Sequence, residues 1–293
     1  MSRRNAPAAP APGGKKLLYP IHAGQQMRFM TTDAEEVLYG GAAFGGKSYA
    51  LRAMLVSYCL QYPGATAVLF RRTFRELEDT HILRLQLEIP SYIATYRAST
   101  HDFIFTNGSI LMCRFCEKEE DVRTYDTFEA DIMAFDELTA FSEFQYTYLI
   151  QRCRSVKPWW SKEDGGPGRR IRSATNPGNI GHVWVKRYWH VFETEMANVI
   201  WKASEGEGGT TRQFIPAKVQ DNPTGMRYNP NYLTQLRALS EEEYRAKALG
   251  DWEIFLGQFF SRWRPSVHVV SDFTIPANWK RYIFVDWGIA VPR

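Results

Sequence analysis

Cysteines and long apolar segments are both scarce in this sequence, and their scarcity argues against several classes of protein. The 293 residues include four cysteines at uneven spacing, which argues against a disulfide framework and favours a reducing compartment. Cys113 and Cys116 form a CxxC pair, but no second pair of ligands accompanies it, so zinc is not expected. Because no run of 18 apolar residues is present, no membrane span is expected either.

An excess of one charge is also missing. The chain carries 36 basic and 32 acidic residues, a formal net charge of +4 that permits a nucleic-acid partner without indicating one. The apolar fraction of 44% indicates a globular protein with one or two domains. The first 14 residues are rich in alanine, proline and glycine and lack the apolar centre of a signal peptide. We expect residues 1–15 to form a disordered N-terminal arm.

A glycine-rich motif, GGAAFGGKS at residues 40–48, carries the strongest functional signal. Four residues fill the pattern G-x-x-x-x-G-K-S: Gly41, Gly46, Lys47 and Ser48. An apolar run precedes the motif and apolar positions at helical spacing follow it, so it joins a strand to a helix. In a phosphate-binding loop, Lys47 would reach the β- and γ-phosphates of a nucleotide and Ser48 would hold Mg²⁺. The alternative is a glycine-rich turn with a solvated lysine.

Strand and helix signals alternate after residue 35. Strands are expected at residues 66–72, 130–137, 169–179 (running into a Pro-Gly turn), 212–219 and 281–290, and helices at 75–89, 142–155 and 182–192. Residues 102–115 are typical of a β-hairpin with Asn107-Gly108 at its turn. This alternation predicts an α/β fold in which helices flank a mainly parallel central sheet.

Two acidic residues, Asp136 and Glu137, end one of the expected strands. An NTPase needs one carboxylate to hold Mg²⁺ and a neighbouring base to orient the attacking water. Asp136 suits the first role and Glu137 the second, because ligands bind at strand ends in open α/β sheets. Thr175 and Asn176 follow the next strand, where they could sense the γ-phosphate, although Asn-Pro-Gly is also ordinary turn chemistry.

In their order and spacing, these motifs resemble the large terminase subunit of tailed bacteriophages, the motor that packs DNA into a procapsid. The matching segments are GGAAFGGKS, FRRTFREL, IMAFDELT, SATNPGN with GHVWVKRYW, and ALGDWEIF. The resemblance implies a P-loop NTPase of the additional-strand (ASCE) type, a small helical lid and an RNase H-like nuclease domain. It places the ATPase core at residues 16–211, the lid at 212–255, and the linker and start of the nuclease domain at 256–293.

The resemblance also implies ATP and Mg²⁺ as cofactors. The residues to which it assigns a role are Lys47 and Glu137 for catalysis, Ser48 and Asp136 for Mg²⁺, Gly41, Gly45, Gly46, Lys47 and Ser48 for ATP, and Thr175 with Asn176 for coupling. It further implies a glutamine that contacts adenine, for which Gln25 and Gln26 are the candidates. Both glutamines could equally be ordinary polar residues of the surface.

One position departs from the family pattern, because many relatives carry an arginine where this sequence has Ala42. An arginine that stabilises the transition state is worth roughly 10³–10⁵ in rate. We therefore expect it to come from elsewhere, for example from a neighbouring subunit of a ring. The candidates flank the strand of Asp136 and are Arg123, Arg152 and Arg154. Arg71 and Arg72 are weaker candidates, and each of these arginines could instead have a surface or ion-pair role.

The nuclease domain is expected to be unfinished in this chain. Asp286 matches the first metal-binding acid of the family's nuclease. Two-metal hydrolysis needs several carboxylates, and the others would lie beyond Arg293. We therefore expect endonuclease activity of the full-length family and not of these residues.

The sequence thus predicts an ATPase that translocates double-stranded DNA. The resemblance implies the portal protein and the small terminase subunit as partners, a homo-oligomeric ring when active and a monomer in isolation. It places the protein in the host cytoplasm, docked transiently on the procapsid. Two alternatives stay open: a helicase-like P-loop nucleic-acid translocase, and a nucleotide-dependent binding protein that hydrolyses little. The pairing of Lys47 with Glu137 argues against the second.

Overall fold

The computed structural model describes residues 18–253, 265–280 and 282. The chain divides into two compact units, Met1–Gln258 and Phe259–Arg293. The described part of the second unit holds one short helix, α10 (Pro265–His268). The predicted N-terminal arm and Asp286 lie outside the described residues, as does nearly all of the strand that the sequence predicts at 281–290.

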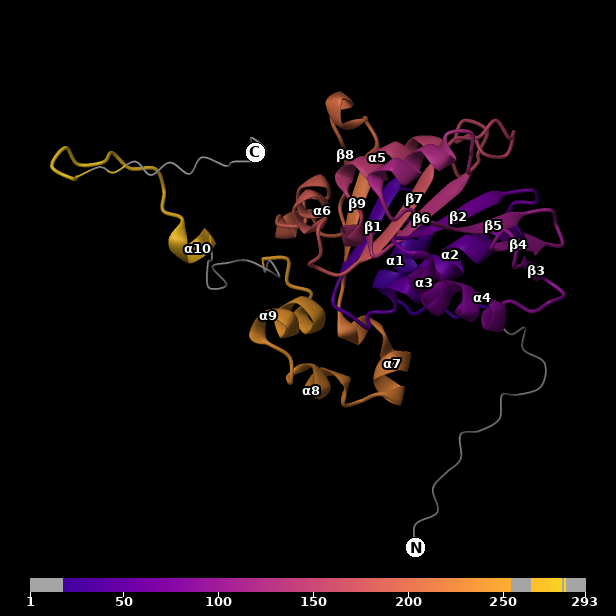
Figure 1. Ribbon diagram of the computed structural model, residues 1–293, viewed down its shortest axis with the longest axis horizontal. Coiled ribbons are helices and arrows are strands. Elements are labelled where there is room, and N and C mark those ends of the chain that lie inside the picture. The colour runs from indigo at the N-terminus through magenta and orange to yellow at the C-terminus, as the bar shows by residue number, and fades with distance from the viewer. Residues whose placement is uncertain (1–17, 254–264, 281, 283–293) are drawn as a thin grey trace, which may run out of the picture. The chain divides into compact units, whose positions relative to one another are not determined.

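Nine strands of the first unit form one sheet (Figure 1). In sequence order, the strands are β1 (Glu36–Gly41), β2 (Thr66–Arg71), β3 (Ala94–Arg97), β4 (Asp102–Phe105), β5 (Ile110–Phe115), β6 (Ile132–Asp136), β7 (Arg170–Thr175), β8 (Ile200–Lys202) and β9 (Thr211–Ala217). Across the sheet their order is β3-β4-β5-β2-β6-β7-β1-β9-β8. The strands from β5 to β9 in this order are parallel, and β3, β4 and β8 add antiparallel pairs at the two edges.

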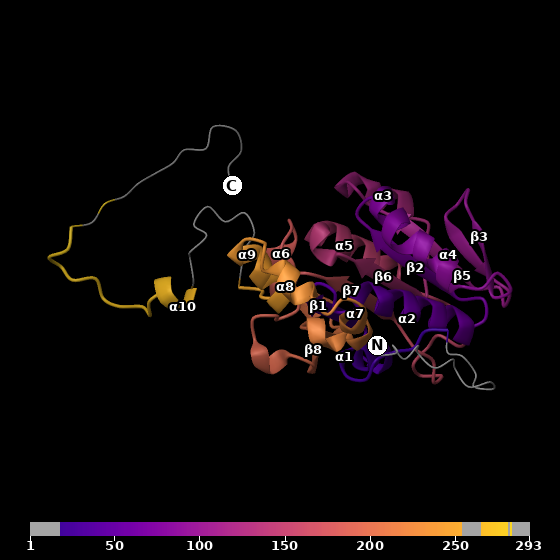
Figure 2. The ribbon, with the colours of Figure 1, turned by 90° about the horizontal axis from the view of Figure 1, so that it is seen from below.

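Helices flank the sheet on both faces. The α-helices of the first unit are α1 (Gln25–Thr31), α2 (Lys47–Gln61), α3 (Phe74–Leu77), α4 (Leu83–Glu88), α5 (Glu143–Leu149), α6 (His182–Tyr188), α7 (Pro223–Tyr228), α8 (Tyr232–Leu236) and α9 (Glu241–Tyr244). A π turn, Glu78–Ile82, joins α3 to α4, and a second one, Arg245–Leu249, follows α9. Short 3-10 turns occupy Glu119–Tyr125, Leu138–Ala140, Ile150–Arg152, Thr194–Met196, Glu205–Glu207 and Val219–Asp221. Figure 1 shows α2, α3 and α4 on one face and α5 on the other, and Figure 2 shows α7, α8 and α9 grouped together.

The central strands are buried on both faces, which explains their nearly continuous apolar sequences. Every residue of β1 is buried. Val37 and Tyr39 belong to the core that includes the side chains of α2, whereas Leu38 belongs to the core that includes α5. Because side chains alternate along a strand, neighbouring residues of β1 must enter opposite cores. The sheet is therefore a platform fixed between two helical layers.

The position of β7 sets up the arrangement of the polar strand ends. β7 pairs with β1 on one side and with β6 on the other. One additional strand thus separates the strand before the glycine-rich loop from the strand that ends in Asp136, and the predicted α/β fold of the additional-strand type is confirmed. Because these strands are parallel, their last residues, Gly41, Asp136 and Thr175, all lie on the side of the sheet where the carboxyl ends of the strands meet.

Several boundaries differ from the sequence predictions. The strand predicted at 212–219 is confirmed as β9, which pairs with β1 and so belongs to the sheet, while the lid boundary at residue 212 stays a prediction. The hairpin around Asn107-Gly108 is confirmed, because β4 and β5 are antiparallel. The helix predicted at 142–155 ends at Leu149 and continues as one 3-10 turn. The short edge strands β3 and β8 were not predicted, because exposed residues interrupt their apolar pattern.

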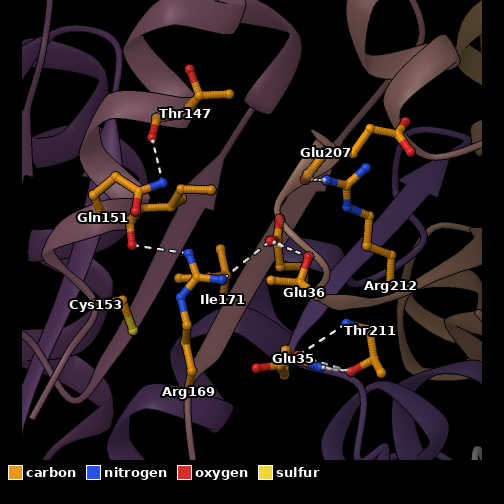
Figure 3. A network of polar contacts seen from close by, with 12 residues as sticks. Glu35, Glu36, Thr147, Gln151, Cys153, Arg169, Ile171, Glu207, Thr211 and Arg212 are labelled. Atoms are coloured by element: carbon orange, nitrogen blue, oxygen red, sulfur yellow. Dashed lines mark hydrogen bonds and ion pairs between the residues drawn. The ribbon is translucent and has the colours of Figure 1, made fainter. Parts of the chain in front are cut away.

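A buried carboxylate holds the amino ends of the parallel strands together. Glu36, which opens β1, is 1% exposed. Its carboxylate accepts four hydrogen bonds, from the hydroxyls of Tyr146, Tyr188 and Thr210 at 2.9 Å each and from Arg169 Nη1 at 3.3 Å. Figure 3 shows Arg169, the residue just before β7, reaching across toward Glu36. A carboxylate with so many donors is satisfied, which indicates a structural role.

Candidate nucleotide-binding site

The loop between β1 and α2 has two positions that only glycine tolerates. Gly41 has a φ of +138° and Gly46 a φ of +78°. A Cβ on Gly41 would lie 2.5 Å from the carbonyl oxygen of Ala217, and a Cβ on Gly46 would lie 2.2 Å from the side-chain nitrogen of Gln26. The loop is therefore held closely between β9 and α1, at a distance that excludes a side chain.

The backbone amides of this loop fall into two groups. Ala42 and Ala43 donate to the carbonyl oxygens of Ala217 and Lys247, at 2.8 and 2.7 Å. Within the described part of the chain, the N–H groups of residues 44–48 have no acceptor. They stand at the start of α2, where the helix dipole adds partial positive charge. A row of unpaired amides at such a helix start is a binding site for an anion such as phosphate.

The loop lines a cavity of about 360 Å³, together with Glu137, Asn176 and Asn222. A larger cavity, of about 740 Å³, lies at the opposite end of the strands, beside Glu36 and Arg169. The carboxylate of Glu36 in that larger cavity already accepts hydrogen bonds from the side chains around it, and no glycine-rich loop lines the cavity. The smaller cavity is therefore the one whose chemistry fits a nucleotide phosphate.

Lys47 is a buried cation at this cavity. The residue is only 6% exposed, and its Nζ donates a hydrogen bond to the carbonyl oxygen of Ala42 at 2.5 Å. Burial lowers the pKa of Lys47 to about 8, although the negative charges of Glu137 and Asp136 act in the opposite direction. A phosphate group in the cavity would favour the charged form of the amine. Lys47 is thus placed to bind an anionic ligand, as the motif predicts.

Asp136, the last residue of β6, is buried and surrounded by donors. Its carboxylate accepts hydrogen bonds from Ser48 Oγ at 3.1 Å, Arg71 Nη1 at 2.5 Å and His81 Nε2 at 2.8 Å. Burial alone would raise the pKa of Asp136, but His81 and Arg71 hold it well below its usual value. The group is therefore a carboxylate at neutral pH. Ser48 and Asp136 offer the hard oxygen donors that Mg²⁺ prefers, so this pair fits the predicted metal-binding role.

Glu137 follows in a left-handed backbone conformation, with a φ of +53°. This conformation is uncommon outside glycine and occurs at functional sites. Burial and the charge of Asp136 raise the pKa of Glu137, and the charge of Lys47 opposes them. A carboxyl group that lines the phosphate cavity and has a raised pKa is suited to accept a proton from water.

The structure brings the predicted coupling residues to Glu137. Thr175 Oγ1 lies 3.5 Å from Glu137 Oε2 and 2.7 Å from Thr139 Oγ1, and it accepts the N–H of Thr139 at 3.1 Å. Asn176 lines the cavity. The end of β7 is therefore in contact both with the candidate base and with the turn that follows it.

The two glutamines before the loop have different environments. Gln26 is buried against Gly46, and its Oε1 accepts the N–H of His22 at 3.2 Å. Gln25 is half-buried. Neither lines the 360 Å³ cavity, so an adenine contact by either residue stays a prediction.

The three arginines that were predicted to supply an arginine finger have partners elsewhere in the same chain. Arg123 donates to Tyr148 Oη at 3.3 Å, Arg152 donates to the carbonyl oxygen of Asp126 at 2.8 Å, and Arg154 pairs with Glu129 at 2.9 Å. Cys153, between two of them, bridges to Ala130 just before β6 begins. Arg152 and Arg154 therefore lie at the opposite end of β6 from Asp136, where they cannot act on the same chain's cavity.

Two residues of the site were missed by the sequence analysis. His81 is fully buried and reaches Asp136 from the π turn between α3 and α4. A lone histidine in a helical pattern gives no signal of this contact. Phe44, within the glycine-rich loop, stacks on Tyr232 of α8 with ring centroids 4.2 Å apart. An aromatic residue inside a glycine-rich loop is the signal that could have found it.

The sheet order, the free amides of the loop and the paired acids define a P-loop NTPase domain of the additional-strand class. A family model described as the N-terminal part of the terminase large subunit, T4likevirus-type, matches residues 38–264. Because the match covers most of the chain, this chain belongs to that terminase family, and the predicted resemblance is confirmed.

Solved structures agree with this assignment at the level of the fold. The structure is similar to that of the large terminase from a thermophilic bacteriophage, with a TM-score of 0.57 and 15% identity over 80% of this chain and 54% of that chain. The same terminase in complex with ATP-γ-S gives a TM-score of 0.56 and 16% identity, over 80% of this chain and 53% of that one. This chain thus spans about half the length of that terminase. No curated protein matches the sequence. In the part of the chain that the structure describes, no helix is long and apolar enough to cross a membrane.

Proposed function

We propose that this chain is the ATP-hydrolysing part of a motor that drives double-stranded DNA into a viral procapsid. The proposal rests mainly on one observation: Lys47, Asp136 and Glu137 lie together beside the loop whose backbone amides have no acceptor. A protein that only bound nucleotide would need the loop and Lys47 but no buried acid with a raised pKa beside them. Membership of the terminase family supports DNA as the polymer that is moved.

In the proposed mechanism, the amides of residues 44–48 and Lys47 bind the phosphates of ATP. Ser48 and Asp136 would hold the Mg²⁺ of the nucleotide, which would offset the charge of the phosphate oxygens. Glu137 accepts a proton from water while the water oxygen bonds to the γ-phosphorus. The bond from phosphorus to the β–γ bridging oxygen breaks, which leaves ADP and phosphate.

The contacts around the loop offer a route by which hydrolysis could move other parts of the protein. Thr175 lies against Glu137, so the end of β7 would respond to loss of the γ-phosphate. The helical segment after β9 (residues 218–253) contacts the loop through the carbonyl of Lys247 and through Tyr232. We propose that this segment is the lid, which shifts against the sheet and moves DNA. The assembly that we propose for DNA packaging is a ring of these subunits. It would dock on the portal in the host cytoplasm together with the small terminase subunit.

Glu137→Gln tests the proposed function. The amide keeps the shape of the side chain but cannot take the proton, so we expect ATP turnover to fall by about 10²–10⁴ while ATP affinity stays within about threefold. Steady-state phosphate release and equilibrium binding of ATP would measure the two effects. Glu143→Gln is a matched control, because Glu143 makes an ion pair with Arg187 on the surface. Turnover in Glu137→Gln equal to that of the control would contradict the proposed function.

A further inference from the structure

The loop has alanine at position 42, so the positive charge that offsets the transition state must come from another residue. Arg71 is the arginine that contacts the acids of the site within the described residues. It is the last residue of β2, which pairs in parallel with β6 so that Phe70 lies opposite Phe135. This register places Arg71 beside Asp136, and its Nη1 lies 2.5 Å from Asp136 Oδ2.

The guanidinium of Arg71 has unused hydrogen-bonding capacity. The side chain is 12% exposed, and its buried Nε has no hydrogen-bond partner. The nearest other acid, Glu76, is 3.8 Å from Nε. Since an arginine carries five N–H donors, most of those of Arg71 are available for a second anion. Its charge also acts on Glu137, which lines the phosphate cavity.

The other two arginines nearby, Arg72 and Arg52, bind different side chains. Arg72 faces the opposite side of β2 and donates to Gln145 of α5. Arg52 lines the cavity, but it makes a two-pronged ion pair with Glu88, at 2.8 and 2.7 Å. Neighbouring residues of a strand point to opposite faces, so Arg71 is the one of this arginine pair whose side chain contacts Asp136.

We propose that Arg71 is a catalytic residue that stabilises the γ-phosphate in cis. The inference rests on the proposed ATP hydrolysis and replaces the expectation of an arginine from a neighbouring subunit. Before nucleotide binds, Asp136 holds Arg71 in place. If Asp136 and Ser48 held the Mg²⁺ of the nucleotide, the charge of Asp136 would be shared with the metal and its attraction for Arg71 would weaken. The γ-phosphate would then be a second anion for the guanidinium, which contacts Asp136 but is not among the groups that line the cavity before nucleotide binds, while His81 continues to hold the carboxylate.

Three variants test this inference. In Arg71→Ala we expect turnover to fall by about 10²–10³ and trapping of ADP with aluminium fluoride to be lost, while ADP affinity stays within about threefold because His81 still holds Asp136. Arg71→Lys keeps the charge beside Asp136 and therefore keeps the fold, but it lacks the planar fork, so we expect at least a tenfold loss. Arg75→Ala is the control, because Arg75 is highly exposed and should leave all three readouts unchanged.

Mixing variants decides whether the residue acts in its own subunit. A one-to-one mixture of Arg71→Ala and Glu137→Gln contains no subunit that has both groups. Action in cis predicts turnover no higher than the mean of the two variants alone. Recovery above that mean would show that Arg71 acts across an interface and would overturn the inference.

The remaining outcomes separate the inference from the proposed function. Turnover that is lost in Glu137→Gln but kept in Arg71→Ala would overturn the inference alone. Turnover that is kept in both variants would overturn the proposed function as well. An equal loss of ADP affinity and turnover in Arg71→Ala would overturn the catalytic role, because it would show that Arg71 only positions Asp136.

Discussion

At the scale of single residues, Gly41 packs its α-carbon against the backbone of β9. Its φ of +138° and the 2.5 Å approach to the carbonyl of Ala217 leave no room for a side chain. The same close approach brings Ala217 within reach of the N–H of Ala42. A glycine at this position is therefore needed both for the turn and for the anchoring of the loop.

Gly41→Ala should destabilise the fold more than another glycine substitution at a positive φ. We expect a loss of about 2–4 kcal/mol in the free energy of unfolding, measured by urea denaturation, because strain and a backbone clash add together. Gly64→Ala is the matched control: its φ is +74° but nothing lies within 4 Å of its added Cβ. That control should lose about 1–2 kcal/mol. Equal losses in the two variants would contradict this account of the loop.

At the scale of the elements, the parallel strands are fixed at both ends by different chemistry. Their carboxyl ends carry the candidate site, and their amino ends are held by Glu36 and the donors around it. A buried ion pair costs desolvation when it forms, but loss of one partner leaves the other charge unpaired. The position of the loop thus depends on residues at the far end of β1.

Glu36→Gln should destabilise the chain by about 2–4 kcal/mol, because Arg169 would be left as a largely buried charge without its acidic partner. Thermal or urea unfolding measures the loss. Glu129→Gln is the control: Glu129 pairs with Arg154, and both side chains are about half exposed. An exposed pair of this kind is worth less than about 1 kcal/mol. A loss in Glu36→Gln no larger than that would show that Glu36 is dispensable.

The contact between Phe44 and Tyr232 joins two elements that are far apart in the sequence. Their stacking adds to the hydrogen bond from Ala43 to Lys247 in holding the loop to the helical segment. Tyr232→Ala should remove about 1 kcal/mol from this contact. We therefore expect hydrogen exchange at the amide of Ala43 to quicken about fivefold, as measured by NMR or mass spectrometry. Unchanged exchange would mean that the stack does not hold the loop.

Local patterns explain how much of these elements could be predicted. The loop, Asp136 and Glu137 were predictable because each motif adjoins an apolar strand in the sequence itself. The contacts of His81 and Arg71 with Asp136 were not, because they depend on the π turn and on the register of β2 against β6. The end of β6 that Arg152 and Arg154 occupy was not predictable either, because closeness in sequence does not say which end of a strand a residue contacts, and a role for these arginines or Arg123 in a neighbouring subunit stays a prediction.

At the scale of the whole molecule, the alternation of strand and helix signals predicted the sheet and its class. The strand at 212–219 was predictable from its apolar pattern, but its pairing with β1 was not, because residues 212–217 carry no signal that distinguishes a strand inside the main sheet from one in a separate subdomain. The two cavities at opposite ends of the strands could not be predicted at all, since side chains from α5, α6 and the segment before β9 meet at one of them only in the folded chain.

The central claim is that nucleotide occupies the smaller cavity, and a crystal structure with Mg²⁺, ADP and aluminium fluoride tests it most directly. We predict phosphate oxygens on the amides of residues 44–48, the metal beside Ser48 and Asp136, and Glu137 facing the fluoride. Nucleotide bound in the 740 Å³ cavity beside Glu36, or phosphates that avoid Lys47, would contradict the account.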